Sequence, residues 1–350
     1  DGNNALYGGA GDDYLVGLGG ADLFYGEAGV DFMAGGLGAD IYHVDNPFDI
    51  VLENAGEGYD EVYTSSSIGL REGVEVERIG TENYLATAAI YITGNEFGQE
   101  IIANNGNNAL SGMGGNDYLV GLDGADQLDG GTGIDVAVGG AGNDIFRVDN
   151  MGDVVREDEG EGLDEVYASA SYTLPAGAHI ELLGTADYLS TAAIDLGGNE
   201  LRNRIAGNNG ANVLRGFDGE DDLNGLEGDD VLDGGAGRDG LMGGEGADIF
   251  RFGSVSDSVA GHEADSIYDF VSGEDRIDLL GIDANALTGG DDAFTFIGGD
   301  AFSGKAGELR WGFEDHQMSL YGDVNGDGAA DFQVVIVGSS WSFVPGDFML

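Results

Sequence analysis

The chain has 350 residues, of which 67 are glycine, three are proline and none is cysteine, so disulfides and thiolate sites are excluded. Its 66 acidic residues outnumber 12 basic ones, and the net charge of −54 argues against nucleic acid or an anionic membrane as a partner. No apolar run approaches the roughly 18 residues that insertion into a bilayer requires. Self-repulsion at this charge disfavours a compact state, whereas a hydrophobic content of 42% favours a folded chain. A bound divalent cation would reconcile the two, so we expect one.

A nine-residue repeat recurs along the chain. In its clearest stretch, residues 216–251, glycine holds positions 1 and 4, aspartate position 6 and an apolar residue position 8. Across 17 such nonamers position 8 is always apolar, and position 6 is aspartate twelve times, asparagine four times and glutamine once. This period is typical of a parallel β-roll in which each nonamer forms one turn and one short strand. We therefore predict an all-β parallel β-solenoid with the position-8 side chains in its core.

A second, longer period is superimposed on the nonamers. Gly8, Gly112 and Gly216 hold equivalent places, and residues 148–197 repeat residues 44–93 without a gap. The two spacers carry short β-type runs, and they either continue the solenoid as irregular coils or form small modules between separate rolls. A solenoid also needs a cap over its last coil, and the aromatic-rich C-terminal region is the candidate. We expect six segments: a first block (1–43), a spacer (44–93), a second block (94–147), the duplicate spacer (148–197), a third block (198–257) and a capping and secretion domain (258–350).

The spacing of the nonamers predicts calcium sites. Two nonamers complete one coil, so each turn stacks on the turn two nonamers further on. Each ion is expected between two position-6 side chains, together with carbonyl oxygens of the glycine turns. Only hard oxygen ligands are offered, which suits Ca²⁺ better than Mg²⁺ or a transition metal. The aspartate pairs are Asp13–Asp31, Asp22–Asp40, Asp117–Asp135, Asp126–Asp144, Asp221–Asp239 and Asp230–Asp248.

Weaker calcium candidates extend this set. Counting two nonamers on from Asp239 gives Asp257 as its partner in a degenerate last turn, with Asp265 close behind. Five mixed pairs replace one carboxylate by an amide, so that seven to twelve ions are expected in all. The mixed pairs are Asn4–Asp22, Gln99–Asp117, Asn108–Asp126, Asn203–Asp221 and Asn212–Asp230.

A further loop resembles the start of an EF-hand. Asp323, Asn325, Asp327 and Asp331 supply oxygen groups around Gly328, but Val334 stands where the loop needs its final glutamate. A calcium-binding turn and a metal-free turn rich in Asx hydrogen bonds are both compatible with this pattern.

No active site is recognisable in the sequence. The run from His262 to Ser266 begins like a zinc-protease helix but has serine where the second histidine must stand. There is also no Gly-x-Ser-x-Gly elbow and no phosphate-binding P-loop. We therefore expect this chain to be non-catalytic in itself.

The nonamers closely resemble those of the RTX (repeats-in-toxin) proteins. The resemblance implies a right-handed β-roll that binds Ca²⁺ through the position-6 aspartates and the glycine-turn carbonyls. Residues 256–279, 294–311 and 322–338 resemble the domain that follows the roll in serralysin-type metalloproteases, and residues 347–350 resemble the acidic-then-apolar tail of type I secretion substrates. These resemblances imply a secreted protein, extracellular or at the cell surface, with calcium and the type I secretion machinery as partners.

The leading functional hypothesis is a module whose folding depends on calcium and which directs type I secretion. Alternatives are a calcium-stiffened adhesin or structural rod, and the C-terminal tail of a secreted hydrolase such as a protease or lipase. Since the chain begins inside a nonamer without methionine, we expect it to be the C-terminal part of a longer protein.

Overall fold

The protein is described by a computed structural model that covers residues 2–314, 317–338 and 343–350. Within these residues it is built of β-strands and two short 3-10 turns, with no α-helix, and strands of one coil pair in parallel with those of the next. The predicted all-β parallel solenoid is thereby confirmed. The chain divides into two compact units, one of Asp1–Tyr167 with Ala178–Ile180 and the other of Ala168–Gly177 with Glu181–Leu350.

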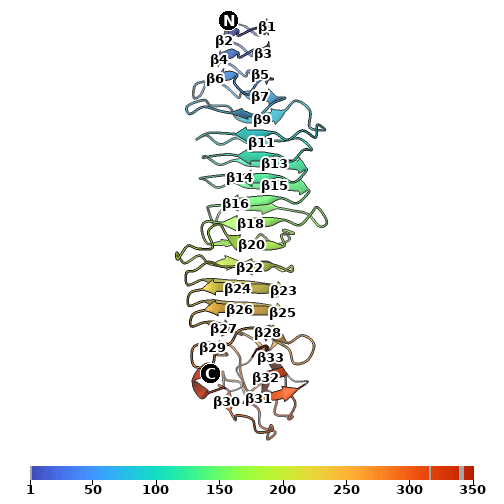
Figure 1. Ribbon diagram of the computed structural model, residues 1–350, viewed down its shortest axis with the longest axis vertical. Helices are drawn as coiled ribbons and strands as arrows, with labels where there is room; N and C mark the ends of the chain where they lie inside the picture. The colour runs from blue at the N-terminus through green and yellow to red at the C-terminus, as the bar shows by residue number, and fades with distance from the viewer. Residues whose placement is uncertain (1, 315–316, 339–342) are drawn as a thin grey trace. The chain divides into compact units, whose positions relative to one another are not determined.

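The first unit is a stack of coils whose strands form long parallel sheets (Figure 1). One sheet contains β1 (Ala5–Ala10), β3 (Leu23–Ala28), β5 (Ile41–Val44), β7 (Glu61–Thr64), β9 (Arg78–Thr81), β11 (Glu100–Ile102), β13 (Tyr118–Asp123), β15 (Val136–Ala141) and β17 (Val154–Arg156). Another contains β2 (Tyr14–Gly19), β4 (Phe32–Leu37) and β6 (Ile50–Leu52). A further run contains β8 (Ile68–Gly69), β10 (Tyr91–Thr93), β12 (Ala109–Ser111), β14 (Gln127–Asp129) and β16 (Ile145–Val148), and β18 (Glu165–Ala168) lies at the boundary of the unit.

Strand register confirms that two nonamers make one coil. Phe24 of β3 lies opposite Leu6 of β1, and Tyr42 of β5 lies opposite Phe24, each step being the length of two nonamers. The steps become irregular in residues 44–93, where the step from Tyr42 to Val62 is longer than two nonamers and the step from Val62 to Ile79 is shorter. Because β7 and β9 pair within the same sheet as β5 and β11, residues 44–93 continue the coils of the first unit instead of forming a separate module.

The second unit continues the same kind of coil and ends in a mixed sheet. One of its sheets contains β19 (Tyr172–Thr173), β21 (Leu196–Gly197), β23 (Val213–Gly219), β25 (Val231–Gly237), β27 (Ile249–Arg251), β29 (Arg276–Asp278) and β34 (Phe348–Met349). Another run contains β20 (Leu182–Thr185), β22 (Arg204–Ala206), β24 (Asp222–Glu227), β26 (Gly240–Glu245) and β28 (Asp265–Ile267), then β33 (Phe332–Ile336), β32 (Gln317–Asp323), β31 (Glu308–Glu314) and β30 (Thr295–Phe296). The 3-10 turns are η1 (Val255–Asp257) and η2 (Pro345–Asp347).

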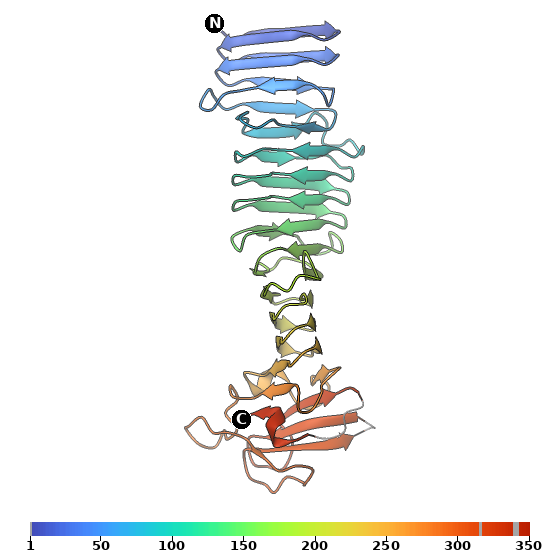
Figure 2. The same cartoon turned by 60° about the vertical axis from the view of Figure 1, so that its left-hand side comes forward.

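The C-terminal strands of the second unit cover the ends of its coil sheets. Strand β33 pairs in parallel with β28, so that Val335 lies opposite Ser266, and then turns back in antiparallel order through β32 and β31. Strand β34 adds to β29, with Phe348 opposite Ile277. These pairings satisfy strand edges that would otherwise remain open, and Figure 2 shows the orange and red strands that make them.

The core of each unit is a column of position-8 side chains. Fourteen of the 17 are buried, and the other three, Leu6, Leu15 and Ala137, are half-buried. Leu6 and Leu15 belong to the first coil, which stacks on β3 and β4. The buried residues are Phe24, Met33, Tyr42, Ile101, Leu110, Leu119, Leu128, Phe146, Ile205, Leu214, Leu223, Leu232, Leu241 and Phe250.

Candidate calcium-binding turns

The nonamer turns that carry aspartate at position 6 are shaped by left-handed backbone at positions 2 and 4. In one turn of the third block, Leu226 at position 2 has φ 82° and Gly228 at position 4 has φ 117°. Glycine is required at position 4 for a second reason, since a Cβ there would overlap the backbone of the preceding coil, as at Gly246 against Gly228. At position 1 a Cβ on Gly225 would overlap the carboxylate of Asp230 and the carbonyl oxygen of Gly243. Position 1 therefore borders a small oxygen-lined cradle.

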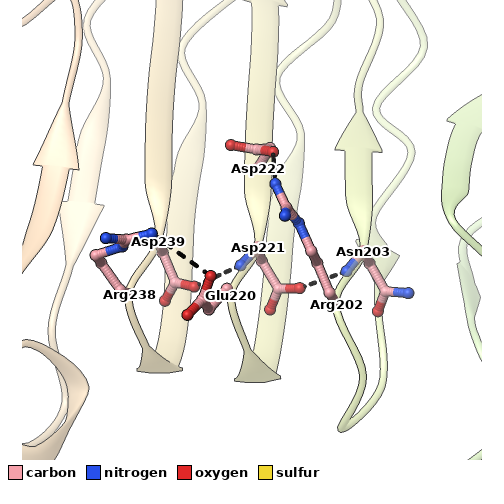
Figure 3. A network of polar contacts seen from close by, with 7 residues as sticks. All are labelled: Arg202, Asn203, Glu220, Asp221, Asp222, Arg238 and Asp239. Carbon is pink, nitrogen blue, oxygen red and sulfur yellow. Dashed lines mark hydrogen bonds and ion pairs between the residues drawn. The ribbon is translucent and has the colours of Figure 1, made fainter. Parts of the chain in front are cut away.

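The position-6 side chains form a ladder along the stacked turns. Asp221 donates its backbone N–H to Oδ1 of Asp239 over 2.8 Å, and Asn203 donates to Oδ1 of Asp221 over 2.7 Å (Figure 3). The same bond joins each predicted aspartate pair within the blocks and each of the five mixed pairs. One carboxylate oxygen of every rung is thus satisfied by backbone from the coil before.

The second oxygen of each aspartate is left without a partner. Oδ2 of all twelve position-6 aspartates is buried and accepts no hydrogen bond from the described residues, and Oδ2 of Asp265 shares this state. In the regular turns this oxygen faces the α-carbon of the position-1 glycine of its own nonamer and the carbonyl oxygen of the position-1 glycine one coil further on. Oδ2 of Asp126, for example, lies near Gly121 and the carbonyl oxygen of Gly139. Buried oxygens without a donor are costly unless a cation meets them. A set of carboxylate and carbonyl oxygens fits Ca²⁺.

The electrostatics of these turns point the same way. Burial raises the pKa of Asp117, Asp144, Asp221, Asp230 and Asp239 to about 7. Negative charge in the metal-free turn is therefore disfavoured near neutral pH, and a bound cation would restore it.

The last turn of the third block differs from the predicted one. Strict counting made Asp257 the partner of Asp239, but Asp239 donates its N–H to Oδ1 of Asp265, 26 residues on, over 2.8 Å. Residues after β27 loop out through η1, where Asp257 accepts the N–H groups of Gly253 and Ser254. The inserted loop shifts the register, so Asp265 stands directly before Ser266 as Asp239 stands before Gly240, its partner in the pairing of β26 with β28.

In the turns of Asn4, Gln99, Asn108 and Asn212 the position-6 amide donates hydrogen bonds that a carboxylate could not make. Nε2 of Gln99 donates to Oδ1 of Asn95 over 2.8 Å, and Nδ2 of Asn212 donates to the carbonyl oxygen of Ile194 over 2.8 Å and to Oδ1 of Asn208 over 3.2 Å. Asn108 donates to the carbonyl oxygen of Asn104 over 2.8 Å. Nδ2 of Asn4 donates to Oδ1 of Asp22 over 3.1 Å. At Asn203 the side-chain oxygen accepts the backbone N–H of Asn199, as a carboxylate could also do.

The EF-hand-like loop is held by its own backbone. Both carboxylate oxygens of Asp323 accept N–H groups, from Gly326 and Gly328. Asn325 donates to Oδ1 of Asp331 over 2.7 Å, and Asp327 accepts the N–H of Ala329. These bonds favour the metal-free alternative for the loop.

Sequence reasoning missed residues that continue the ladder into the spacers. Asp31 bonds Asp49 and Asp135 bonds Asp153, both 18 residues on, so an unbroken count would have found them. Asp60, Asp164 and Asp275 take the same place after insertions in the coil. Glu53 joins Asp40 and Asp60, and Glu157 joins Asp144 and Asp164, in two buried groups with no signal in the nonamer.

Two further sequence features are the protease-like run from His262 to Ser266 and the lack of long apolar stretches. The run from His262 to Ser266 is not a helix, since it leads from an exposed turn into β28. Among the described residues no helix is long and apolar enough to cross a membrane.

Comparison with known proteins assigns most of the chain. Residues 193–350 match the family described as Peptidase M10 serralysin C terminal, and residues 1–42 and 93–150 match the RTX calcium-binding nonapeptide repeat. The chain is 42% identical over 93 residues to metallopeptidase AprA of Pseudomonas marginalis and 40% identical over 78 residues to serralysin G of Dickeya chrysanthemi. These matches cover 26% and 22% of the chain but only 18% and 15% of the relatives.

Solved structures show a looser likeness. The AlgE6R3 subunit of the mannuronan C5-epimerase of Azotobacter vinelandii is 29% identical, with a TM-score of 0.32 over 43% of this chain and 78% of that one. The extracellular lipase LipA of Serratia marcescens is 16% identical, with a TM-score of 0.30 over 83% of this chain and 45% of that one. The glycine–aspartate turns and both family matches lead to one conclusion. The chain carries RTX calcium-binding nonapeptide repeats, and its residues 193–350 match the serralysin C-terminal family.

Proposed function

We propose that this chain is a calcium-dependent folding and secretion module of an extracellular protein, without catalytic activity of its own. The observation that carries the proposal is the row of buried, unpartnered Oδ2 atoms at the position-6 aspartates. Calcium ions lie between the six within-block aspartate pairs and between Asp239 and Asp265. Turns closed by an amide at position 6 need no ion of their own. The six-segment organisation is part of the same proposal, with residues 258–350 as cap and secretion domain.

Calcium concentration supplies the switch. In a cytosol poor in calcium, repulsion among the carboxylates of a chain with net charge −54 keeps it unfolded and able to pass through a secretion channel. Outside, at roughly 10⁻⁴–10⁻³ M calcium, where extracellular modules bind, each ion neutralises a turn and closes a coil. The free energy of binding then contributes directly to folding.

The C-terminal tail supports this order of events. In the folded chain Asp347 is buried, and its carboxylate accepts bonds from Oγ of Ser272 and from the N–H of Gly273. Phe348 is also buried, in β34. A tail held in this way is available to secretion machinery only before folding, so calcium-induced folding follows recognition.

The test is far-UV circular dichroism of the chain during a calcium titration that starts in excess EDTA. We expect β-structure to appear cooperatively as calcium rises, with magnesium at the same concentration ineffective. A chain that is already fully β-structured in EDTA, and unchanged by calcium, would overturn the proposal.

One comparison favours a narrower function. The similarity to metallopeptidase AprA and serralysin G supports the hypothesis that the chain is the C-terminal part of a secreted protease. Sequencing the gene upstream of Asp1 tests it, since a zinc-binding helix is expected there. Further nonamers in that position would instead favour a calcium-stiffened rod or adhesin, which the continuous coils of residues 44–93 also allow.

A further inference from the structure

Two groups of three buried carboxylates lie where a nonamer block meets the spacer that follows it. One consists of Asp40, Glu53 and Asp60, and the other of Asp144, Glu157 and Asp164. In each group the three side chains offer oxygens within 4.8 Å of one another. Both groups lie in the first unit, and their glutamates stand outside the position-6 pattern. We call them the first and the second junction.

The glutamate takes the place of a backbone ligand. In a regular turn, a Cβ built on Gly121 would meet Oδ2 of Asp126 and the carbonyl oxygen of Gly139. A Cβ built on Gly139 would meet Oδ2 of Asp144 and, in place of a carbonyl, Oε1 of Glu157. Glu157 follows Gly139 by the length of two nonamers, so its carboxylate enters the cradle from the coil position that normally supplies the glycine carbonyl.

At the second junction the described residues satisfy only part of the hydrogen-bonding capacity of the three carboxylates. Glu157 is 4% exposed, and both of its carboxylate oxygens are buried without a hydrogen-bond partner among the described residues. Oδ2 of Asp144 is in the same state, while its N–H bonds Oδ1 of Asp164 over 2.8 Å. Three converging carboxylates in a buried site repel one another, and burial without a donor makes their charge costly.

The first junction repeats the arrangement in the earlier copy of this segment. A Cβ on Gly35 would meet Oδ2 of Asp40 and Oε1 of Glu53, as at the second junction. Here the hydroxyl of Tyr42 donates to Oε1 of Glu53, whereas Phe146 stands at the equivalent position of the second junction. All three carboxylates recur in both copies.

We propose that each junction binds one calcium ion through its three carboxylates, and binds it more tightly than the paired-aspartate turns. This inference rests on the proposed calcium-dependent folding. A third carboxylate in place of a carbonyl raises the ligand charge, which is a principal determinant of calcium affinity in proteins. The junction ions would fasten each spacer to the block before it, and they would be the first to bind as calcium rises.

Native mass spectrometry of the full chain during a calcium titration tests the proposal. We expect the Glu53→Gln/Glu157→Gln variant to bind two calcium ions fewer, or to bind two of them at least about tenfold more weakly. Glu159→Gln, which removes the same charge from an exposed position close to Glu157, should match the unaltered chain. Circular dichroism at saturating calcium verifies that each variant is folded.

The outcomes separate the two proposals. If the unaltered chain binds no calcium, calcium-dependent folding itself fails. If it binds calcium and the double variant binds as many ions at the same concentrations, only the junction sites fail. A double variant that does not fold is replaced by the single variants, each of which should lose one ion from the early part of the titration.

Discussion

Asp239 and Asp265 are joined across 26 residues by a 2.8 Å hydrogen bond from the backbone of the first to the carboxylate of the second. Throughout the regular turns the same bond spans 18 residues, as between Asp221 and Asp239. A coil that contains an inserted loop can thus still place an aspartate where it accepts the backbone N–H of the preceding turn's aspartate. What the turns preserve is the position of the carboxylate relative to its strand, and not the length of chain between carboxylates.

This register shift yields a first prediction. Asp265→Asn should weaken binding of the terminal calcium ion about tenfold or more, because Oδ2 of Asp265 is buried without a partner among the described residues. Asp257→Asn should leave calcium binding nearly unchanged, since Asp257 bonds the backbone of its own loop. Isothermal titration calorimetry with calcium measures the affinity of both variants. The reverse order of effects would show that strict counting was right.

An interior turn allows a second prediction. Asp230→Asn removes a charge from the pair that Asp230 forms with Asp248, so we expect the calcium midpoint for folding to rise by about tenfold. Asp218→Asn is the matched control because Asp218 is exposed and lies in a neighbouring turn of the same block. Circular dichroism at increasing calcium gives both midpoints. Equal midpoints would remove Asp230 from the calcium site.

The amide turns provide a third prediction. Asn212→Asp deletes the N–H groups that bond Ile194 and Asn208 and adds a carboxylate at position 6. We expect the variant to bind one more calcium ion and to need more calcium before it folds. Asn209→Asp adds the same charge beside this turn and serves as the control. Native mass spectrometry counts the ions, and an unchanged count in Asn212→Asp would contradict the role given to the amide.

The fourth prediction concerns pH in the absence of calcium. Burial raises the pKa of Asp126 to about 6, of Asp239 to about 7 and of Glu157 to about 9, so the folded state binds more protons than the unfolded one above pH 4. The metal-free fold should therefore gain stability as pH falls from about 9 towards 4, and lose it as pH rises through the same range. Circular dichroism in EDTA across this range measures the effect. With calcium bound the trend should reverse, because protons compete with the ion for the carboxylates.

Much of the fold was predictable because the nonamer repeats a physical constraint at every turn. Position 8 is apolar in each repeat, and residues such as Phe24 and Leu232 are fully buried in the structure. Position-6 aspartates pair across the length of two nonamers wherever the nonamers are unbroken, as Asp126 does with Asp144. Asp60 escaped prediction because the coil before it is longer than two nonamers, so that sequence distance no longer gives spatial distance. Glu53 keeps the regular spacing from Gly35, but the nonamer pattern gives no sign that a glutamate there replaces a glycine carbonyl.

The sequence by itself determined the solenoid, its core column and the aspartates that face the turns, because strict periodicity converts position along the chain into position on a coil. Only the tertiary structure decided which carboxylates meet at the ends of the blocks. Asp265 replaces Asp257 there because an inserted loop shifts the register of the last turn. Glu157 enters the cradle beside Gly139 because its side chain reaches the place that a glycine carbonyl takes in the regular turns. At each junction the glycine–aspartate turn is thereby completed by a glutamate that the nonamer pattern does not predict.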